Sequence, residues 1–156
     1  MMKPLREVKL NLPGALYLHS MPGKEEPLSE CFQALEGAAA DYIICLNPME
    51  EIQEKSPDYA EAIQNDSLPC GLIHCPIGIG GIPDDTDAFL NLARDVAEKL
   101  KTGTSFLVHC KGGVGRTGTM ASCIVAALDQ PLSLVTDAGG KAESEQQQTL
   151  ISSLYN

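Results

Sequence analysis

The sequence predicts an α/β fold, a three-layer sandwich in which a central, mainly parallel sheet is flanked by helices. Short apolar runs that fit buried strands alternate along the chain with segments of helical periodicity. Such alternation requires crossover connections, which place parallel strands in one sheet and helices on both of its faces. The chain has 156 residues and no internal repeat or low-complexity tract. We therefore expect residues 1–156 to form a single domain.

Four short apolar runs are the expected strands, at 15–19, 41–46, 72–75 and 105–109. In an open parallel sheet, ligands bind beyond the carboxyl ends of the strands. Cys75 and Cys110 stand at two such ends, so we expect them at one edge of the sheet.

Helical spacing or helix-start residues mark the segments between and after these strands. A periodic segment is capped by Asp84 or Asp85 and ended by Thr102-Gly103. Residues 1–14 are expected to be a polar lead-in. The other predicted helices are 28–40, 49–55, 57–65, 116–129, 131–138 and 142–155.

Charge and cysteine content exclude several classes of protein. The formal net charge of −10 argues against nucleic acid and anionic membranes as partners, although a local basic pocket can override it. No secretory signal or membrane-spanning run is visible. Six cysteines without close spacing indicate reduced thiols in a cytosol, and the absence of a Cys-x-x-Cys pair argues against structural zinc.

The segment 108–118 carries the chemistry. It places Cys110 at the start of a glycine-rich loop and Arg116 at its end, between an expected strand and an expected helix. Glycines let successive backbone N–H groups turn inward, and at a helix N-terminus such groups form a nest for a tetrahedral anion. The same field favours the thiolate form of Cys110. Arg116 offers a planar fork for two phosphate oxygens, so the loop is that of a thiol nucleophile aimed at phosphorus.

A strand–turn–helix with a buried structural cysteine is the alternative for this segment. It leaves the glycines and Arg116 unexplained, so the catalytic interpretation is favoured.

The stretch from His109-Cys110 to Arg116-Thr117 resembles the signature loop of the cysteine-dependent protein tyrosine phosphatase superfamily. Residues 16–23 resemble the opening strand of its compact dual-specificity members, and 75–84 resemble their mobile acid loop. The likeness is greatest to the group of the cyclin-dependent-kinase-associated phosphatase and its bacterial relatives. It implies a tyrosine phosphatase-like fold, a cysteinyl-phosphate intermediate, and a protein tyrosine or dual-specificity phosphatase that needs no metal or other cofactor. The implied substrates are a phosphorylated protein or a small aryl phosphate. The oligomeric state is left open by the sequence, with a monomer favoured.

The resemblance also assigns roles within the loop. Cys110 would attack phosphorus, and Arg116 would bind the phosphate and stabilise its transition state. The Thr117 hydroxyl would assist departure of the thiolate, or Thr117 is simply an early residue of the helix. His109 would orient the loop rather than exchange protons. Lys111 is either a substrate contact or a solvated charge, and Val114 weakens a lipid-phosphate reading. The residues expected to line the phosphate are Lys111, Gly112, Gly113, Val114, Gly115 and Arg116.

The acid loop departs from the family pattern. Aligning Pro76, Gly80, Gly81 and Pro83 puts Ile79 where the family carries an aspartic acid that protonates the leaving oxygen. Asp84 and Asp85 follow, and each is either the proton donor or a helix cap. Without a donor we expect slow turnover of alkyl phosphates, because general acid catalysis contributes typically ~10²–10⁴-fold. This tilts the expected substrate toward phosphotyrosine.

Two further assignments stay open. Gln146 resembles the glutamine that positions the hydrolytic water in relatives, although the run 145–148 makes the register ambiguous and a polar helix face is the alternative. Cys45 or Cys75 would form a protective disulfide with Cys110 under oxidation, or would simply be a packed thiol.

Two other functions compete with the phosphatase. One is a phosphate-binding module, a catalytically weak pseudophosphatase in which Ile79 has replaced the acid. The other is a thiol enzyme acting on another oxyanion, such as arsenate, which Thr117-Gly118 and Gly80-Gly81 fit less well.

Overall fold

The computed structural model describes residues 5–79 and 81–155, so Gly80 of the acid loop and the first four residues of the lead-in lie outside it. Its sheet has the strand order β1-β2-β5-β3-β4. β1 pairs antiparallel with β2, and the other three pairings are parallel. The strands are β1 (Arg6–Val8), β2 (Leu16–His19), β3 (Tyr42–Cys45), β4 (Gly71–His74) and β5 (Phe106–His109).

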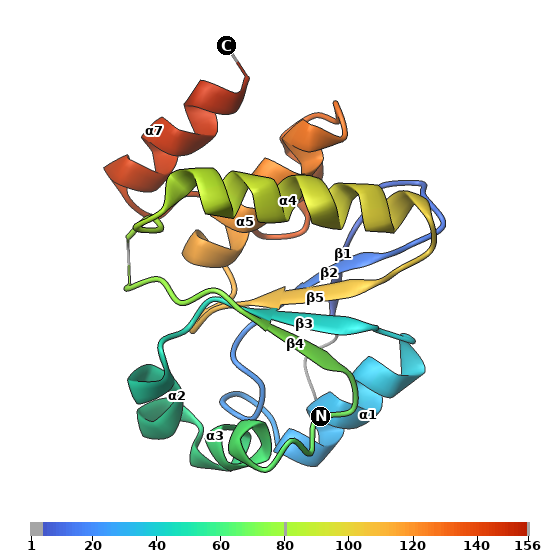
Figure 1. Cartoon of the computed structure of the whole chain (residues 1–156), viewed down its shortest axis with the longest axis vertical. Coiled ribbons are helices and arrows are strands. Elements are labelled where there is room, and N and C mark those ends of the chain that lie inside the picture. The colour runs from blue at the N-terminus through green and yellow to red at the C-terminus, as the bar shows by residue number, and fades with distance from the viewer. Residues whose placement is uncertain (1–4, 80, 156) are drawn as a thin grey trace.

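Helices cover both faces of this sheet, so the predicted three-layer α/β fold is confirmed (Figure 1). One layer contains α1 (Leu28–Gly37), α2 (Met49–Lys55) and α3 (Pro57–Gln64). The other contains α4 (Thr86–Lys101), α5 (Gly115–Ala127), α6 (Ser133–Asp137) and α7 (Glu145–Leu154).

The structure departs most from the expected elements at three places. β1 lies in the segment expected to be an irregular lead-in, because a three-residue edge strand is too short to show an alternating pattern. α1 ends at Gly37 rather than at residue 40, and Ala39 adopts a left-handed φ of 54°. α7 starts at Glu145 rather than at 142, because the Ser144 side chain accepts a hydrogen bond from the Gln147 N–H and caps the helix there.

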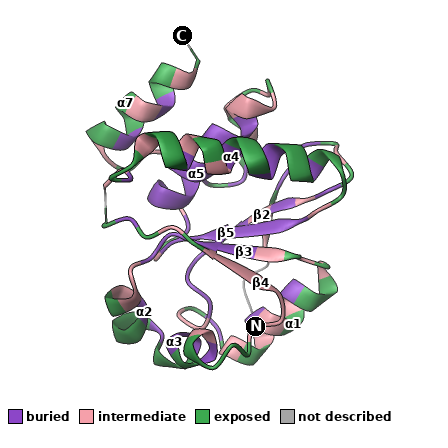
Figure 2. Cartoon of the chain, viewed as in Figure 1, coloured by how far each residue is buried: buried purple, intermediate pink, exposed green. Residues whose placement is uncertain are grey.

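Each face of the sheet has its own apolar core. The core under α4 and α5 includes Phe89, Val108 and Ile124, and the core under α1 and α3 includes Leu35 and Tyr59. Figure 2 shows the buried residues concentrated along β5, β3 and α5. α5 is buried from Gly115 through Val125. The segment after β5 is therefore anchored between a central strand and a buried helix, which makes it a rigid support for a site.

The carboxyl ends of four strands line up at one edge. His109 is paired in register with His19 on one side and Cys45 on the other, and Cys45 is paired with His74. Cys110 and Cys75 are the next residues along β5 and β4. The prediction that both thiols come at the same edge of the sheet is confirmed.

No helix within the described residues is long and apolar enough to cross a membrane.

Candidate active site

The loop between β5 and α5 is held from outside through its carbonyl oxygens. Three donors from distant parts of the chain reach them: Met21 N to Lys111 O at 3.2 Å, Arg6 Nη2 to Gly113 O at 2.7 Å, and Lys141 N to Val114 O at 3.1 Å.

The amide side of the same loop is unoccupied by protein. The backbone N–H groups of residues 111–116 donate to no acceptor among the residues that the structure describes. They stand at the N-terminus of α5, where the helix dipole favours an anion. A nest that binds a tetrahedral oxyanion needs its backbone N–H groups free to donate to the anion. This loop meets that requirement because its carbonyl oxygens accept hydrogen bonds from outside and its amides have no acceptor among the described residues.

Gly113 permits this path. Its φ is 73°, and a Cβ there would lie 2.5 Å from His19 O and 2.6 Å from Arg6 Nη2. Both the backbone conformation and the close approach of β2 therefore exclude a side chain at this position.

Arg116 closes the loop and is oriented by Glu51. Its Nη1 and Nη2 donate to the two carboxylate oxygens of Glu51 at 2.8 and 3.0 Å, and Nη1 also donates to Ile77 O at 2.7 Å. The Arg116 side chain is 4% exposed. These contacts fix the plane of the guanidinium and leave its other N–H groups for a ligand.

Electrostatics keep this pair charged. Burial alone would lower the pKa of Arg116, but its hydrogen bonds to Glu51 and its contact with Cys110 outweigh burial and raise it. Burial alone would raise the pKa of Glu51, but its hydrogen bonds to Arg116 and Asn47 and the nearby charge of Lys111 lower it. The site therefore retains a fixed positive charge at the mouth of the loop although the chain as a whole is acidic.

His109 supports the loop from below. Its Nδ1 lies 3.3 Å from Cys110 O and its Nε2 lies 2.7 Å from the Tyr59 hydroxyl. A carbonyl can only accept, so Nδ1 carries the proton and Tyr59 O–H donates to Nε2. Burial lowers the pKa of His109 to about 3. It is neutral at ordinary pH, which supports the positioning role expected from the sequence.

Thr117 has an unpaired hydroxyl. The residue is fully buried, and its Oγ1 has no hydrogen-bond partner in the described structure. An orphaned buried hydroxyl one residue after Arg116 fits the role expected for Thr117, in which it donates to the sulfur of Cys110.

The acid loop is held by a hydrogen bond on each side of its tip. Ile77 O accepts from Arg116, and Gly81 O accepts from Gln147 Nε2 at 3.1 Å. Ile79 lies between them and is 70% exposed.

The two aspartates after the loop have different positions. The Asp85 side chain accepts from Ala88 N at 3.0 Å and caps α4, as one of the two expectations for it stated. Asp84 is exposed and makes no hydrogen bond within the described residues. A role for Asp84 as the proton donor stays a prediction from the sequence.

Gln146 and Gln147 have different surroundings in the structure. Gln146 is exposed, whereas Gln147 is fully buried and bridges two segments. Gln147 Nε2 donates to Gly81 O, and Gln147 Oε1 accepts from Glu143 N at 2.8 Å. The cap at Ser144 sets which side of α7 faces the loop and turns Gln147 toward it. The exposure of Gln146 fits the alternative stated for it, a polar helix face, and a role for it in positioning water stays a prediction.

The other thiols at the site edge are poor nucleophiles. Burial raises the pKa of Cys45 to about 12 and also raises the pKa of Cys75. All six cysteines are free. Little thiolate is available for attack at neutral pH, so a protective disulfide stays a prediction without structural support.

One group of described side chains has metal-ligand types close together. Ligand atoms of His19, Glu26 and Cys31 lie within 4.8 Å of one another. His19 Nε2 contacts Glu26 Oε1, and Glu26 Oε2 accepts from Gly23 N at 3.0 Å. These contacts hold the turn after β2, and His19 Nδ1 has no hydrogen-bond partner within the described residues.

Comparison with known proteins agrees with this geometry. A family model described as "PTP-SAK: Swiss Army Knife protein, DSP-PTPase phosphatase domain" matches residues 10–154. The chain therefore belongs to the DSP-PTPase phosphatase family.

Two curated relatives share shorter stretches. Human cyclin-dependent kinase inhibitor 3 is 35% identical over 66 residues, which is 41% of this chain and 31% of that protein. Mouse receptor-type tyrosine-protein phosphatase eta is 48% identical over 42 residues, which is 25% of this chain and 3% of that protein. The chain thus matches less than a third of the length of either relative.

Two solved structures share the fold. Kinase associated phosphatase (KAP), with its catalytic-site cysteine replaced by serine, matches with a TM-score of 0.75 at 18% identity over 97% of this chain and 94% of that chain. The active form of Tk-PTP matches with a TM-score of 0.63 at 19% identity over 99% and 97%. The expected likeness to the kinase-associated group is confirmed at the level of fold.

Proposed function

We propose that this protein is a phosphomonoester hydrolase, a protein tyrosine or dual-specificity phosphatase that works through a cysteinyl-phosphate at Cys110. The observation that carries the proposal is the loop of unbonded amides that starts at this thiol and ends at the Glu51-oriented Arg116. Such donors stabilise the charge that develops on a phosphoryl group in transfer.

In this mechanism the phosphoryl oxygens bind the amides of 111–116 and the free side of Arg116. The sulfur of Cys110 attacks phosphorus, the bond to the leaving oxygen breaks, and the leaving oxygen keeps the electron pair. Water then attacks the cysteinyl-phosphate, and the sulfur leaves as a thiolate with the help of the Thr117 hydroxyl. Every protein group in these two steps belongs to residues 110–117. We therefore propose that no metal or other cofactor takes part.

The first step lacks an acid at the usual position, because Ile79 has no proton to donate. We propose an aryl phosphate such as phosphotyrosine as substrate, since a phenolate leaves without a proton more easily than an alkoxide. A single domain, a monomeric state and a cytosolic location stay predictions from the sequence.

The exposed Ile79 also favours a second candidate, a pseudophosphatase that binds phosphorylated protein and hydrolyses it poorly. Turnover of p-nitrophenyl phosphate in the presence of a chelator separates the two. The phosphatase turns it over, and Cys110→Ser abolishes turnover. A pseudophosphatase binds a phosphotyrosine peptide in a titration and gives no turnover above that of Cys110→Ser.

A further inference from the structure

Glu143 places a free carboxylate beside the phosphate loop. If Gly115 carried a Cβ, that atom would lie 2.5 Å from Glu143 Oε1 and 3.1 Å from Glu143 Cβ. The Glu143 side chain therefore runs across the face of Gly115, and its Oε1 lies within about 4 Å of the Gly115 Cα. Gly115 is the residue just before Arg116 and contributes one of the unbonded amides.

The backbone of Glu143 is fixed while its carboxylate is not engaged. Its N–H donates to Gln147 Oε1, and Gln147 is itself tied to Gly81 of the acid loop. The carboxylate makes no hydrogen bond or ion pair with the described residues, and the residue is exposed to water. It is thus a positioned proton acceptor that reaches both the loop and solvent.

Several other side chains that could accept a proton near the loop are already hydrogen-bonded to protein groups. Glu51 is paired with Arg116 through both of its oxygens and with Asn47. Gln147 uses both ends of its amide, and Asp85 caps α4. Ile79 cannot accept a proton. Among the described side chains that contact the loop, Glu143 is the one with an unoccupied carboxylate.

We propose that Glu143 is the general base of the hydrolysis step, an inference that rests on the proposed phosphatase function. A water molecule held between Glu143 and the phosphoryl group attacks phosphorus. The new oxygen–phosphorus bond forms as the sulfur–phosphorus bond breaks, and the electron pair of that bond returns to Cys110. The proton of the water passes to the Glu143 carboxylate and then to solvent.

A carboxylate at this place also repels the dianionic substrate. Removing its charge therefore has two opposite effects, tighter phosphate binding and slower hydrolysis of the intermediate. A residue with a merely structural role would not separate KM from kcat in this way.

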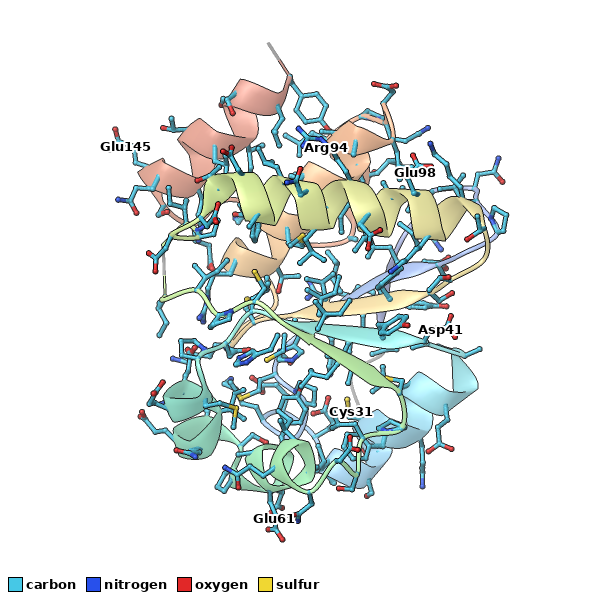
Figure 3. All side chains as sticks on the ribbon, in the orientation of Figure 1. Cys31, Asp41, Glu61, Arg94, Glu98 and Glu145 are labelled. Carbon is cyan, nitrogen blue, oxygen red and sulfur yellow. The ribbon has the colours of Figure 1, made fainter. Side chains whose placement is uncertain are left out.

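The test is stopped-flow release of p-nitrophenol by the parent and by Glu143→Gln, with Glu145→Gln as the control. Glu145 is exposed and points outward from the start of α7 (Figure 3), so its substitution makes the same charge change away from the loop. We expect Glu143→Gln to give a burst of about one nitrophenol per Cys110, followed by turnover roughly 10²-fold slower than the parent at a lower KM. We expect Glu145→Gln to stay within about twofold of the parent.

Intact-mass analysis after acid quench adds an independent readout. The cysteinyl-phosphate should reach a much larger fraction of the protein in Glu143→Gln than in the parent or the control. Turnover equal to the parent with no rise in this fraction overturns the role of Glu143 and leaves the phosphatase proposal intact. If no variant, the parent included, releases nitrophenol in a Cys110-dependent manner, the phosphatase proposal fails and this inference fails with it. Alkylation of Cys110 at the parental rate shows that the loop of Glu143→Gln is intact.

Discussion

Glu51 holds Arg116 with both carboxylate oxygens, at 2.8 and 3.0 Å, so a residue of α2 sets the orientation of a residue in the first turn of α5. The two helices lie on opposite faces of the sheet (Figure 1). The ion pair joins the two layers at the edge where the strands end, and it aims the guanidinium at the loop.

Replacing Glu51 by Gln should therefore damage both stability and catalysis. Arg116 would stay buried without its counter-charge, which costs roughly 3 kcal/mol of unfolding free energy. Misorientation of the guanidinium should lower kcat/KM for an aryl phosphate by roughly 10- to 100-fold. Glu50→Gln, on an exposed neighbour, is the matched control. Urea unfolding and steady-state kinetics measure both effects, and parental values for Glu51→Gln would show that the ion pair has no such role.

Gly113 should not tolerate a methyl group. Gly113→Ala places a Cβ against His19 O at a positive φ, and we expect it to lower the free energy of unfolding by roughly 3 kcal/mol. Gly112→Ala meets no atom within 4 Å, and should change stability by less than about 1 kcal/mol. Equal denaturation midpoints for the two variants would contradict the geometry given for the loop.

The buried neutral His109 should make stability fall in mild acid. Its pKa is lowered from 6.5 to about 3 in the folded state, so between these values the unfolded chain binds one more proton. The stabilisation is complete above pH 6.5 and is lost as pH falls toward 3, by about 1.4 kcal/mol per pH unit. His109→Gln should remove this slope from denaturation curves taken between pH 6 and pH 4.5. A variant with the same slope as the parent would refute the assignment.

Arg6 should matter for the reactivity of the thiol although it lies on the edge strand β1. Its guanidinium bonds Gly113 O and Ala138 O, so Arg6→Met removes a support of the loop and a nearby positive charge. We expect Cys110 alkylation by iodoacetamide at neutral pH to slow by roughly 10-fold. Lys9→Met removes a charge whose side chain is 79% exposed, and should leave the rate unchanged. Equal rates in both variants would remove Arg6 from the site.

Placing a carboxylic acid at position 79 should widen the substrate range. Ile79→Asp should raise turnover of alkyl phosphates by at least about 10-fold and that of p-nitrophenyl phosphate much less, because only the poor leaving group needs a proton. Ile79→Asn controls for polarity. A gain that is the same in both variants, or no gain with alkyl phosphates, would show that Ile79 does not stand at the position of the acid.

The central part of the site was predictable because it is local in the sequence. Cys110, the glycines and Arg116 lie within seven residues, and the strand before them and the helix after them are marked by apolar patterns. The fold class followed from the same alternation. β1 could not be predicted, since a three-residue edge strand has no period to read.

The supporting residues were missed because their contacts are distant in the chain. Arg6 reaches Gly113 across 107 positions and Glu51 reaches Arg116 across 65. One feature of the sequence pointed to Glu51 as a site residue: it follows a strand whose carboxyl end was expected at the site. Which glutamine of the run 145–148 faces the loop depends on where α7 begins. The side chain of a single residue, Ser144, sets that starting point by capping the helix. The side chains that position the loop thus come from segments far apart in the sequence. These segments meet at the edge of the sheet only when the chain is folded.

Acid-quenched mass analysis of the intact protein and of its Cys110 peptide, during turnover of p-nitrophenyl phosphate with a chelator present, tests the central claim most directly. A detectable fraction of the parent should carry one additional phosphoryl group on the peptide that contains Cys110, and Cys110→Ser should carry none. Turnover with no phosphoryl adduct on that peptide, or turnover that survives Cys110→Ser, would contradict the account.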